Sequence, residues 1–344
     1  MNPITEHIKE LAQCWGAVRV GITTKETLAG GPPSTDLNFI LPGAKSAVTF
    51  ALPLNKELIR SFFAKKERLS HERDNLQTNM KSSGIAASLA KHLEQLGYPS
   101  SGVVANESYR EEEGKGRFGM HPDLSHRYLA VRSGVGWFGF SGNVITPEYG
   151  AAVILGTCVT TAELEPTVPL PQEENYCDNC KLCLASCCSG LMDPEIVTKV
   201  TLGDQEFSYS KRINYHRCEF VCGGMTGLHP SRKWSTWSPG RFAIPNDDAG
   251  FREAMKKGMK AYVRRPVMEG GAPHVLMRAK LYLTCGNCQL LCWPSLEDRK
   301  ENFKILTDSG VVIQRPDGTL QRVAPEEGEA YVKNLDEERR SLYV

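Results

Sequence analysis

The sequence lacks several features that would each point to a particular class of protein. Its 41 basic and 40 acidic residues leave a formal net charge of +1, so no excess of positive charge favours nucleic acid. The longest apolar runs are only strand-sized, which argues against a membrane span. The first residues, MNPITEHIKELAQCWGAVRV, carry no secretory signal. We therefore expect a cytoplasmic protein with no membrane partner.

The chain also lacks internal repeats of solenoid period and low-complexity segments, which excludes a repeat protein and a largely disordered chain. Hydrophobic residues make up 41% of its 344 residues. That content is enough to bury a substantial core, and the length allows two domains.

Cysteine is abundant instead: the chain has 12. The motif C-x2-C-x2-C-x3-C, by which bacterial ferredoxins bind a 4Fe-4S cluster, is formed by Cys177, Cys180, Cys183 and Cys187. A second motif, C-x2-C-x3-C, is formed by Cys285, Cys288 and Cys292. Zinc would need only two pairs of cysteines per site, and disulfides do not suit a reducing cytoplasm. The spacing predicts two 4Fe-4S clusters.

Two such clusters need an eighth thiolate. The remaining candidates are Cys14, Cys158, Cys188, Cys218 and Cys222. We expect Cys218 to be the ligand, with Cys222 as the alternative. Cys14 and Cys158 lie in apolar stretches and are expected to pack as small hydrophobic residues, and Cys188 is expected to be a bystander. Crossover of ligands, as in two-cluster ferredoxins, would group Cys177, Cys180, Cys183 and Cys292 around one cluster and Cys187, Cys218, Cys285 and Cys288 around the other.

Hydrophobic periodicity and turn residues predict a mixed α and β chain. Helices are expected at 3–14, within 70–98, around 125–133 and at 249–263, and strands at 17–22, 44–54 and 101–106. Hairpins are expected between 143–146 and 151–161 and around Pro316-Asp317-Gly318. Trp234 and Trp237 argue against disorder in 226–268, which would either cover a cofactor or pack over the clusters.

The segment RSGVGWFGFSGNVITPEYGAAVILG at 132–156 resembles the glycine-rich signature of the epoxyqueuosine reductase and reductive dehalogenase superfamily. In that superfamily the signature precedes the same pair of cysteine motifs. The N-terminal LPGAKSAVTFALPL, followed by Arg73, Asp74 and a long helical stretch, is also similar. The resemblance extends to about residue 300.

This resemblance implies an α+β protein: a nitroreductase-like, cobalamin-binding α/β domain followed by a two-cluster ferredoxin-like domain. We assign the first domain to 1–165, the second, with its Trp-rich insertion, to 166–300, and a C-terminal hairpin and tail to 301–344. The implied cofactors are two 4Fe-4S clusters and cobalamin. Carried over by position, Gly136, Trp137, Gly139, Ser141, Asn143 and Thr146 would lie along the corrin. A strand–helix junction that binds no ligand is the alternative for these residues.

The sequence departs from the family pattern at two positions. Met120 stands where epoxyqueuosine reductases have an acid-donor aspartate, and Phe140 replaces the lysine of the signature. Reductive dehalogenases use a tyrosine donor backed by a basic residue, and they usually carry a twin-arginine signal, which the residues at the start of this sequence do not show. Neither substrate is therefore securely implied.

A reductive step usually adds a proton, so a donor near the reacting centre is needed. Tyr109, His121, Asp123 and His126 qualify by residue type. The alternative for each is a solvated loop residue or a helix cap, and Asp123 is well placed as an N-cap.

The leading hypothesis is an iron-sulfur oxidoreductase, dependent on cobalamin, that cleaves or eliminates a bond in a small organic substrate. A ferredoxin or flavodoxin-type carrier would supply its electrons. The alternative is a cobalamin-free electron-transfer protein that docks a redox partner. Epoxyqueuosine reduction on transfer RNA is disfavoured by Met120 and by the lack of a basic surplus. Nucleic acid is thus an unlikely partner, and formation of a homo-oligomer is left open.

Overall fold

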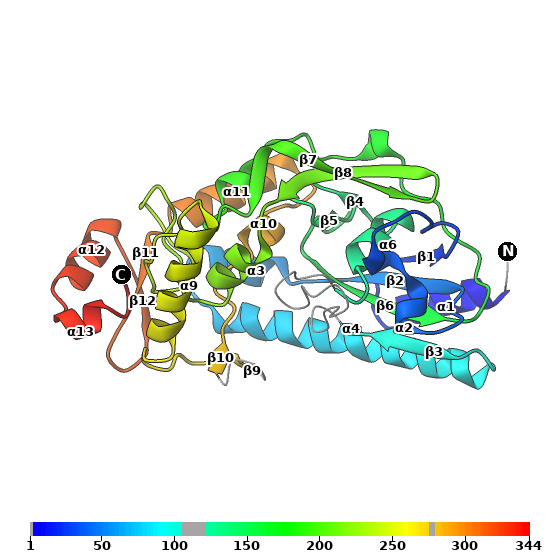
Figure 1. The fold of residues 1–344 in the computed structure, drawn as a ribbon, viewed down its shortest axis with the longest axis horizontal. Coiled ribbons are helices and arrows are strands. Elements are labelled where there is room, and N and C mark those ends of the chain that lie inside the picture. Colours follow the sequence, from blue (N-terminus) through cyan, green and yellow to red (C-terminus); the bar gives the residue numbers. More distant parts are fainter. Residues whose placement is uncertain (1–2, 105–121, 275–278) are drawn as a thin grey trace.

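The computed structural model describes residues 3–104, 122–274 and 279–344. Its central element is a four-stranded sheet of order β1-β2-β6-β3, in which every neighbouring pair is antiparallel. The strands are β1 (Arg19–Thr24), β2 (Ser46–Pro53), β3 (Ser100–Val103) and β6 (Val153–Thr160). Figure 1 shows the long helix α4 (Leu69–Gln95) running along this sheet.

Strand β2 is buried on both faces because helices cover both sides of the sheet. Its Val48, Phe50 and Leu52 pack with α4 and with α1 (Pro3–Cys14). Its alternate residues Ala47 and Ala51 belong to clusters that include α6 (His126–Arg132). The two-residue period of a strand thus divides one apolar run between two helical layers.

Most N-terminal elements agree with the sequence predictions. Helix α1 has the expected bounds, and α4 ends just before Gly97, whose φ of +91° suits a left-handed helix terminus. The cap of α6 is Ser125, whose hydroxyl accepts from the Tyr128 N–H, so the prediction of an Asp123 N-cap was wrong. The short elements η1 (Pro33–Thr35), α2 (Leu37–Ile40) and α3 (Lys56–Phe63) connect the strands.

The hairpin predicted between 143–146 and 151–161 was wrong. Strand β5 (Val144–Ile145) pairs with β4 (Trp137–Phe138), whereas β6 lies between β2 and β3 in the main sheet. A Thr146–Gly150 bridge is the one pairing across PEYG. Strand β6 is long and apolar, and it pairs with β2 on one side and with β3 on the other. Strand β5 has only two residues, so it could not replace these partners.

The second half is built from short elements around the cysteine motifs. They are η2 (Gln172–Glu174), α7 (Leu182–Ala185), the hairpin of β7 (Met192–Leu202) and β8 (Gln205–Arg212), α8 (Tyr215–Cys222), α9 (Asp248–Tyr262), β9 (Ala272–His274), β10 (Ala279–Leu281) and α10 (Asn287–Leu290). Helix α9 agrees with its prediction to one residue, whereas the β7–β8 hairpin was not predicted.

The C-terminal part contains more helix than a hairpin and tail. Its elements are α11 (Leu296–Thr307), β11 (Val311–Gln314), β12 (Leu320–Val323), α12 (Pro325–Lys333) and α13 (Glu337–Arg340). The β11–β12 hairpin confirms the prediction around Asp317-Gly318, and α11 runs across residue 300.

One core joins the first and second halves. Phe62 and Phe63 of α3 share a buried cluster with Trp234, Trp237 and cysteines of both motif regions. The Trp237 indole donates to the carbonyl of Phe62 at 2.9 Å. The tryptophan-rich segment therefore packs in the core beside the cysteines, as the packing alternative predicted.

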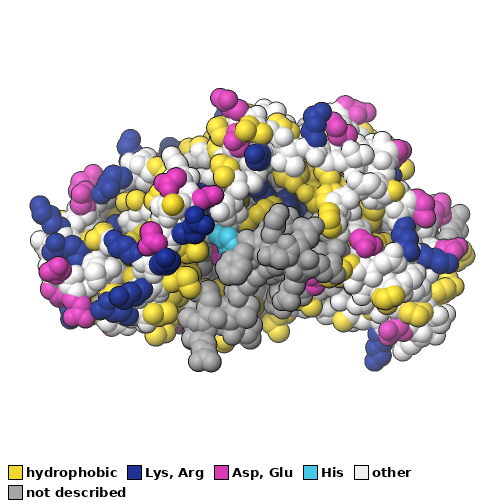
Figure 2. All heavy atoms as spheres, in the orientation of Figure 1, with side chains coloured by type: hydrophobic (Ala, Val, Ile, Leu, Met, Phe, Trp, Pro, Cys, Tyr) yellow, Lys and Arg dark blue, Asp and Glu magenta, His cyan; other side chains and the backbone are white. Residues whose placement is uncertain are grey.

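The described residues include no helix long and apolar enough to cross a membrane. Figure 2 shows basic and acidic side chains mixed over one face, with more of the basic ones toward α9 and the C-terminal helices.

Cys158 is buried in the sheet core as predicted, but Cys14 at the end of α1 is exposed, so its predicted packing role was wrong.

Substitution of Gly102 by alanine should destabilise the protein, whereas Gly84→Ala should stabilise it. A Cβ at Gly102 would lie 2.7 Å from the backbone nitrogen of Ala87 in α4, but a Cβ at Gly84 would meet nothing within 4 Å. We expect Gly102→Ala to lower the free energy of unfolding by about 1–3 kcal/mol and Gly84→Ala to raise it by about 0.5–1 kcal/mol. Urea denaturation of both variants measures this, and equal effects would contradict the packing of α4 on β3.

Candidate functional site

The cysteines of the two motifs gather into two groups in space. All twelve cysteines of the chain are free thiols. Electrostatic coupling joins Cys292 to Cys177, Cys180 and Cys183. A second set of couplings joins Cys288 to Cys187, Cys218 and Cys285. We call these sets the first group and the second group. They are the sets expected from ferredoxin crossover.

Burial opposes ionisation of several of these thiols. It raises the pKa of Cys183 to about 12, with Cys177 and Cys180 acting in the same direction. Burial also raises the pKa of Cys288 well above its usual value. Thiols crowded in this way are stabilised as thiolates when a metal cluster supplies positive charge. The donor set therefore fits two iron-sulfur clusters.

No three Cys, His, Asp or Glu side chains in the described ranges come close enough to share one metal ion. A tetrahedral zinc site requires three or four such side chains close enough to bind the same ion. A 4Fe-4S cluster instead places each thiolate on a different iron, so its ligands lie farther apart.

Residues of α8 and the segment before α10 meet in the second group. The sulfurs of Cys218 and Cys222 lie 3.6 Å apart on successive turns of α8. A hydrogen bond with Cys222 lowers the pKa of Cys285 to about 7. Cys218 couples to Cys288, whereas the thiols that act on Cys222 are Cys218 and Cys285. Cys218 is thus the better placed of the two to complete the second group.

The glycine-rich segment touches both groups. The backbone N–H of Phe140 donates to the Cys177 sulfur at 3.2 Å, and the Asn143 amide donates to the Cys288 sulfur at 3.6 Å. Hydrogen bonds to sulfur stabilise negative charge on a cluster and influence its reduction potential. This segment therefore holds the two groups in fixed positions relative to each other.

The other residues that the resemblance assigned to the corrin are packed against protein. Trp137 lies in a cluster with Cys292 and donates its indole N–H to the carbonyl of Pro171. A Cβ at Gly136 would meet the backbone of Ile145 at 2.6 Å, and one at Gly139 would meet its side chain at 3.2 Å. The glycines are thus accounted for by close contacts between β4 and β5.

Thr146 and Ser141 also bond within the chain. The hydroxyl of Thr146 donates to the carbonyl of Gly150 at 3.2 Å, and the Ser141 carbonyl accepts from Arg212 at 3.0 Å. Both side chains are buried. The contacts described for the carried-over residues are therefore contacts with protein, and these positions do not fit a corrin surface.

A tyrosine between two arginines lies beside the second group. Arg127 donates to the Tyr215 hydroxyl at 3.1 Å and Arg212 donates to it at 3.4 Å. Arg212 also donates to the side-chain oxygen of Asn143 at 3.0 Å. Burial acts to raise the pKa of Tyr215, but Arg127 and Arg212 outweigh it and lower that pKa. Tyr215 is therefore a stronger acid than an ordinary tyrosine.

Sequence reasoning missed Tyr215 and both arginines. Tyr215 precedes Cys218 by three residues on α8, so it shares a helix face with that thiol. That spacing was a signal within the sequence. Arg127 adjoins the predicted candidate His126, but only the fold brings its guanidinium to Tyr215.

Two of the proton-donor candidates from the sequence, His126 and Asp123, lie within the described residues. His126 is buried, and its Nδ1 lies 2.7 Å from the Thr157 hydroxyl in the main sheet. Burial lowers the pKa of His126 to about 4, so the ring is neutral at neutral pH. Asp123 is partly buried in the segment before α6. Tyr109 and His121 lie outside the described residues.

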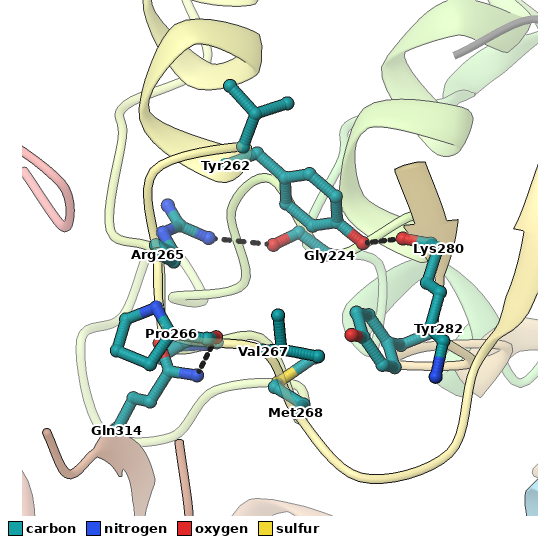
Figure 3. A pocket seen from close by; sticks show the side chains of 11 residues that line it. Gly224, Tyr262, Arg265, Pro266, Val267, Met268, Lys280, Tyr282 and Gln314 are labelled. Atoms are coloured by element: carbon teal, nitrogen blue, oxygen red, sulfur yellow. Dashed lines mark hydrogen bonds between the residues drawn. The ribbon is translucent and has the colours of Figure 1, made fainter. Parts of the chain in front are cut away.

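A separate pocket of about 320 Å³ opens beside α9 and β10. Its lining includes Tyr262, Val267, Met268 and Tyr282. Figure 3 shows two of its polar side chains bonded to protein: Tyr262 donates to the carbonyl of Lys280, and Arg265 donates to that of Gly224. Its described lining contributes mainly apolar surface, so we place the candidate site at the cysteine groups.

Replacement of Cys218 by serine should remove about four irons from a protein loaded with two clusters, because that cluster would lose one of its four ligands. Cys222→Ser should retain both clusters. Cys14→Ser is the control, since Cys14 is exposed at the end of α1. Iron and sulfide quantification after anaerobic purification distinguishes the variants. Loss of the irons in Cys222→Ser alone would identify Cys222 as the ligand instead.

No protein-family model matches the chain. An epoxyqueuosine reductase from Gloeobacter violaceus is 26% identical over 229 residues, which are 57% of this chain and 64% of that protein. One from Synechocystis sp. is 29% identical over 154 residues, 38% of this chain and 48% of that protein.

Two solved structures share the fold. A reductive dehalogenase whose structure suggests a mechanism for B12-dependent dehalogenation matches with a TM-score of 0.50 at 17% identity, over 94% of this chain and 40% of that one. A catabolic reductive dehalogenase also has a TM-score of 0.50 at 17% identity, over 72% of this chain and 33% of that one. In each of these comparisons, the match spans less than two thirds of the relative's length. The chain is thus similar in sequence to epoxyqueuosine reductases and shares its fold with reductive dehalogenases, as its glycine-rich and cysteine motifs predicted.

Proposed function

We propose that this chain is an iron-sulfur oxidoreductase whose two cysteine groups each bind a 4Fe-4S cluster. The ligands would be Cys177, Cys180, Cys183 and Cys292 in the first group and Cys187, Cys218, Cys285 and Cys288 in the second. The observation that carries this proposal is the spatial sorting of the motif cysteines into two crossover groups, each with a sulfur that accepts a hydrogen bond from the glycine-rich segment.

The charges around the groups support this assignment. Arg299 acts on Cys292 in the first group, and Arg212 acts on Cys288 in the second. A 4Fe-4S cluster with four thiolates is an anion, and nearby cations offset the cost of burying it. Arg299 also pairs with Asp178, and Arg212 also donates to Tyr215 and Asn143, so both guanidinium groups are held in place beside the thiols.

The reaction we propose is a two-electron reductive cleavage in a small organic substrate. An external carrier of the ferredoxin or flavodoxin type would supply two electrons, and clusters held by the two cysteine groups would let them pass one at a time. The substrate gains both electrons and one proton. Its bond to a leaving group breaks, and the leaving group departs with the bonding pair.

Tyr215 is the residue we assign as proton donor. Its hydroxyl lies between two guanidinium groups, which stabilise the phenolate left after the proton is transferred. Its side chain is partly exposed, and Asn143 and Arg212 connect it to Cys288. Electrons and a proton would thus be delivered in the same region.

A cobalamin-dependent reductase is the second candidate, favoured by the fold shared with a dehalogenase described as B12-dependent. Bound cobalamin would supply a strongly reducing cobalt centre. Gly136, Trp137, Gly139 and Thr146 contact protein in this chain, so a corrin would have to be held by other residues. We derive no step of the mechanism through it.

Transfer RNA stays a candidate substrate, despite the expectation that nucleic acid is an unlikely partner. The curated relatives are epoxyqueuosine reductases, and one solved enzyme of that name was crystallised with a modified tRNA stem loop. The near-zero net charge of this chain still favours a small substrate.

Anaerobic purification with iron, sulfide and cobalt quantification tests the cofactors. We expect about eight irons per chain. Hydroxocobalamin is then titrated into the reconstituted protein. Uptake of about one equivalent would establish the second candidate, and no uptake would leave the clusters as the redox centres. A protein that binds zinc but no iron would overturn the proposal.

Tyr215→Phe should slow turnover by about 10²-fold or more, because it removes the proposed proton donor. Substrates are found by following oxidation of reduced methyl viologen with a panel of halogenated phenols and an epoxyqueuosine stem loop. Tyr128→Phe is the matched control, since it removes the hydroxyl that lies 2.8 Å from Tyr209. Equal turnover by the two variants, with intact clusters in both, would refute the role of Tyr215.

A further inference from the structure

Lys65 is a buried lysine directly after the C-cap of α3, whose Phe62 and Phe63 share a buried cluster with Cys285 of the second group. Only 5% of it is exposed, and its ammonium group donates a hydrogen bond to the hydroxyl of Ser309. The charged groups that act on it are the thiols of Cys188 and Cys285 and the guanidinium of Arg322. Burial lowers the pKa of Lys65 to about 7, and the two thiols oppose that shift. The lysine thus has anionic partners only if thiolates are present.

The backbone at Lys65 is of a kind that usually selects glycine. Its φ is +52°, and it directly follows the C-cap of α3. The N–H groups of Lys65 and Lys66 donate to the carbonyls of Phe62 and Ser61, which is the Schellman pattern. Lysine in this left-handed position costs about 1 kcal/mol or more relative to glycine. A buried charge at a strained position indicates a role other than ending the helix.

The hydrogen bond to Ser309 is the alternative explanation for a lysine at this buried position. A neutral side chain could make that bond without the cost of burying an ammonium group. The hydrogen bond therefore explains the position of the amine but not its charge.

Two further cations lie beside the second group: Arg217 is buried and Arg212 is half-buried. Arg212 acts on Cys218 and Cys288, and Arg217 acts on Cys187. In the first group, Arg299 acts on Cys292 and Cys180, and Cys180 is exposed. Cys180 of the first group is exposed, whereas the second group has one buried thiol, Cys285, and three half-buried ones.

We propose that the charge of Lys65 raises the reduction potential of the cluster held by the second group. This inference rests on the proposed function. Reduction adds one negative charge to the cluster, and the burial of Cys285 and the partial burial of the other three thiols oppose that charge. A buried ammonium group nearby stabilises the added electron and opposes that effect. The anionic cluster in turn keeps Lys65 protonated.

A higher reduction potential in the second group would favour electron flow from the first group to the second. Cys180 is exposed, so a cluster held by the first group would be the one that an external carrier could reduce. The charge of Lys65 would keep a cluster in the second group reducible by the first. Asn143 and Arg212 connect Cys288 of the second group to Tyr215.

A redox titration followed by electron paramagnetic resonance tests the role of Lys65. The variants are Lys65→Met and Lys65→Gln, which remove the charge, and Lys65→Arg, which keeps it. Lys66→Met is the matched control, because Lys66 is the next residue and is exposed. Ser309→Ala tests the hydrogen bond alone. The signal of the second cluster is identified by its loss in Cys218→Ser.

At a fixed potential, we expect the ratio of reduced to oxidised second cluster to fall about tenfold in the neutral variants, which is ~59 mV for one electron. Lys65→Arg, Lys66→Met and Ser309→Ala should change it less than about twofold, which is ~18 mV. Equal titration curves for Lys65→Met and Lys66→Met would overturn the inference, as would an equal shift in Ser309→Ala.

Iron content separates failure of this inference from failure of the proposed function. If the wild-type protein holds no iron, the proposed function itself is wrong. Loss of about four irons in both neutral variants but not in Lys65→Arg would support a role for the charge in holding the second cluster. The same loss in all three Lys65 variants would show a packing role and contradict the inference.

Discussion

Compensation of negative charge in a buried space is the constraint on which the rest of this structure depends. Burial raises the pKa of thiols such as Cys183 and Cys288. They can serve as thiolates only where metal, cations and hydrogen-bond donors oppose that effect. Arg212 and Lys65 come from segments far apart in sequence, and both act on cysteines of the second group. The fold can be understood as the scaffold that brings these charges together.

The glycine-rich segment connects the sheet domain to this charged region. Its turn is compact because Gly136 and Gly139 allow β4 and β5 to approach closely. That compactness places the Phe140 N–H at one group and the Asn143 amide at the other. A motif that would be interpreted as a cofactor cradle is thus a structural bridge between two cysteine groups in this chain.

The site also combines acid and redox chemistry in one place. Tyr215 and Cys218 lie on the same short helix, one turn apart. Arg212 donates both to the Tyr215 hydroxyl and to Asn143, which contacts Cys288. The same cation can therefore stabilise a phenolate after proton transfer and an added electron on the cluster, which suits a reaction that consumes both.

The sequence by itself determined the parts that depend on local spacing: α1, α4 and α9 and the β11–β12 hairpin. Helical periodicity and C-x2-C spacing act over a few residues, so they are visible in one dimension. Tertiary structure alone decided that β6 lies between β2 and β3, and that Lys65 meets Cys285. Those contacts join residues far apart in the chain, and their partners are set by how the whole core closes.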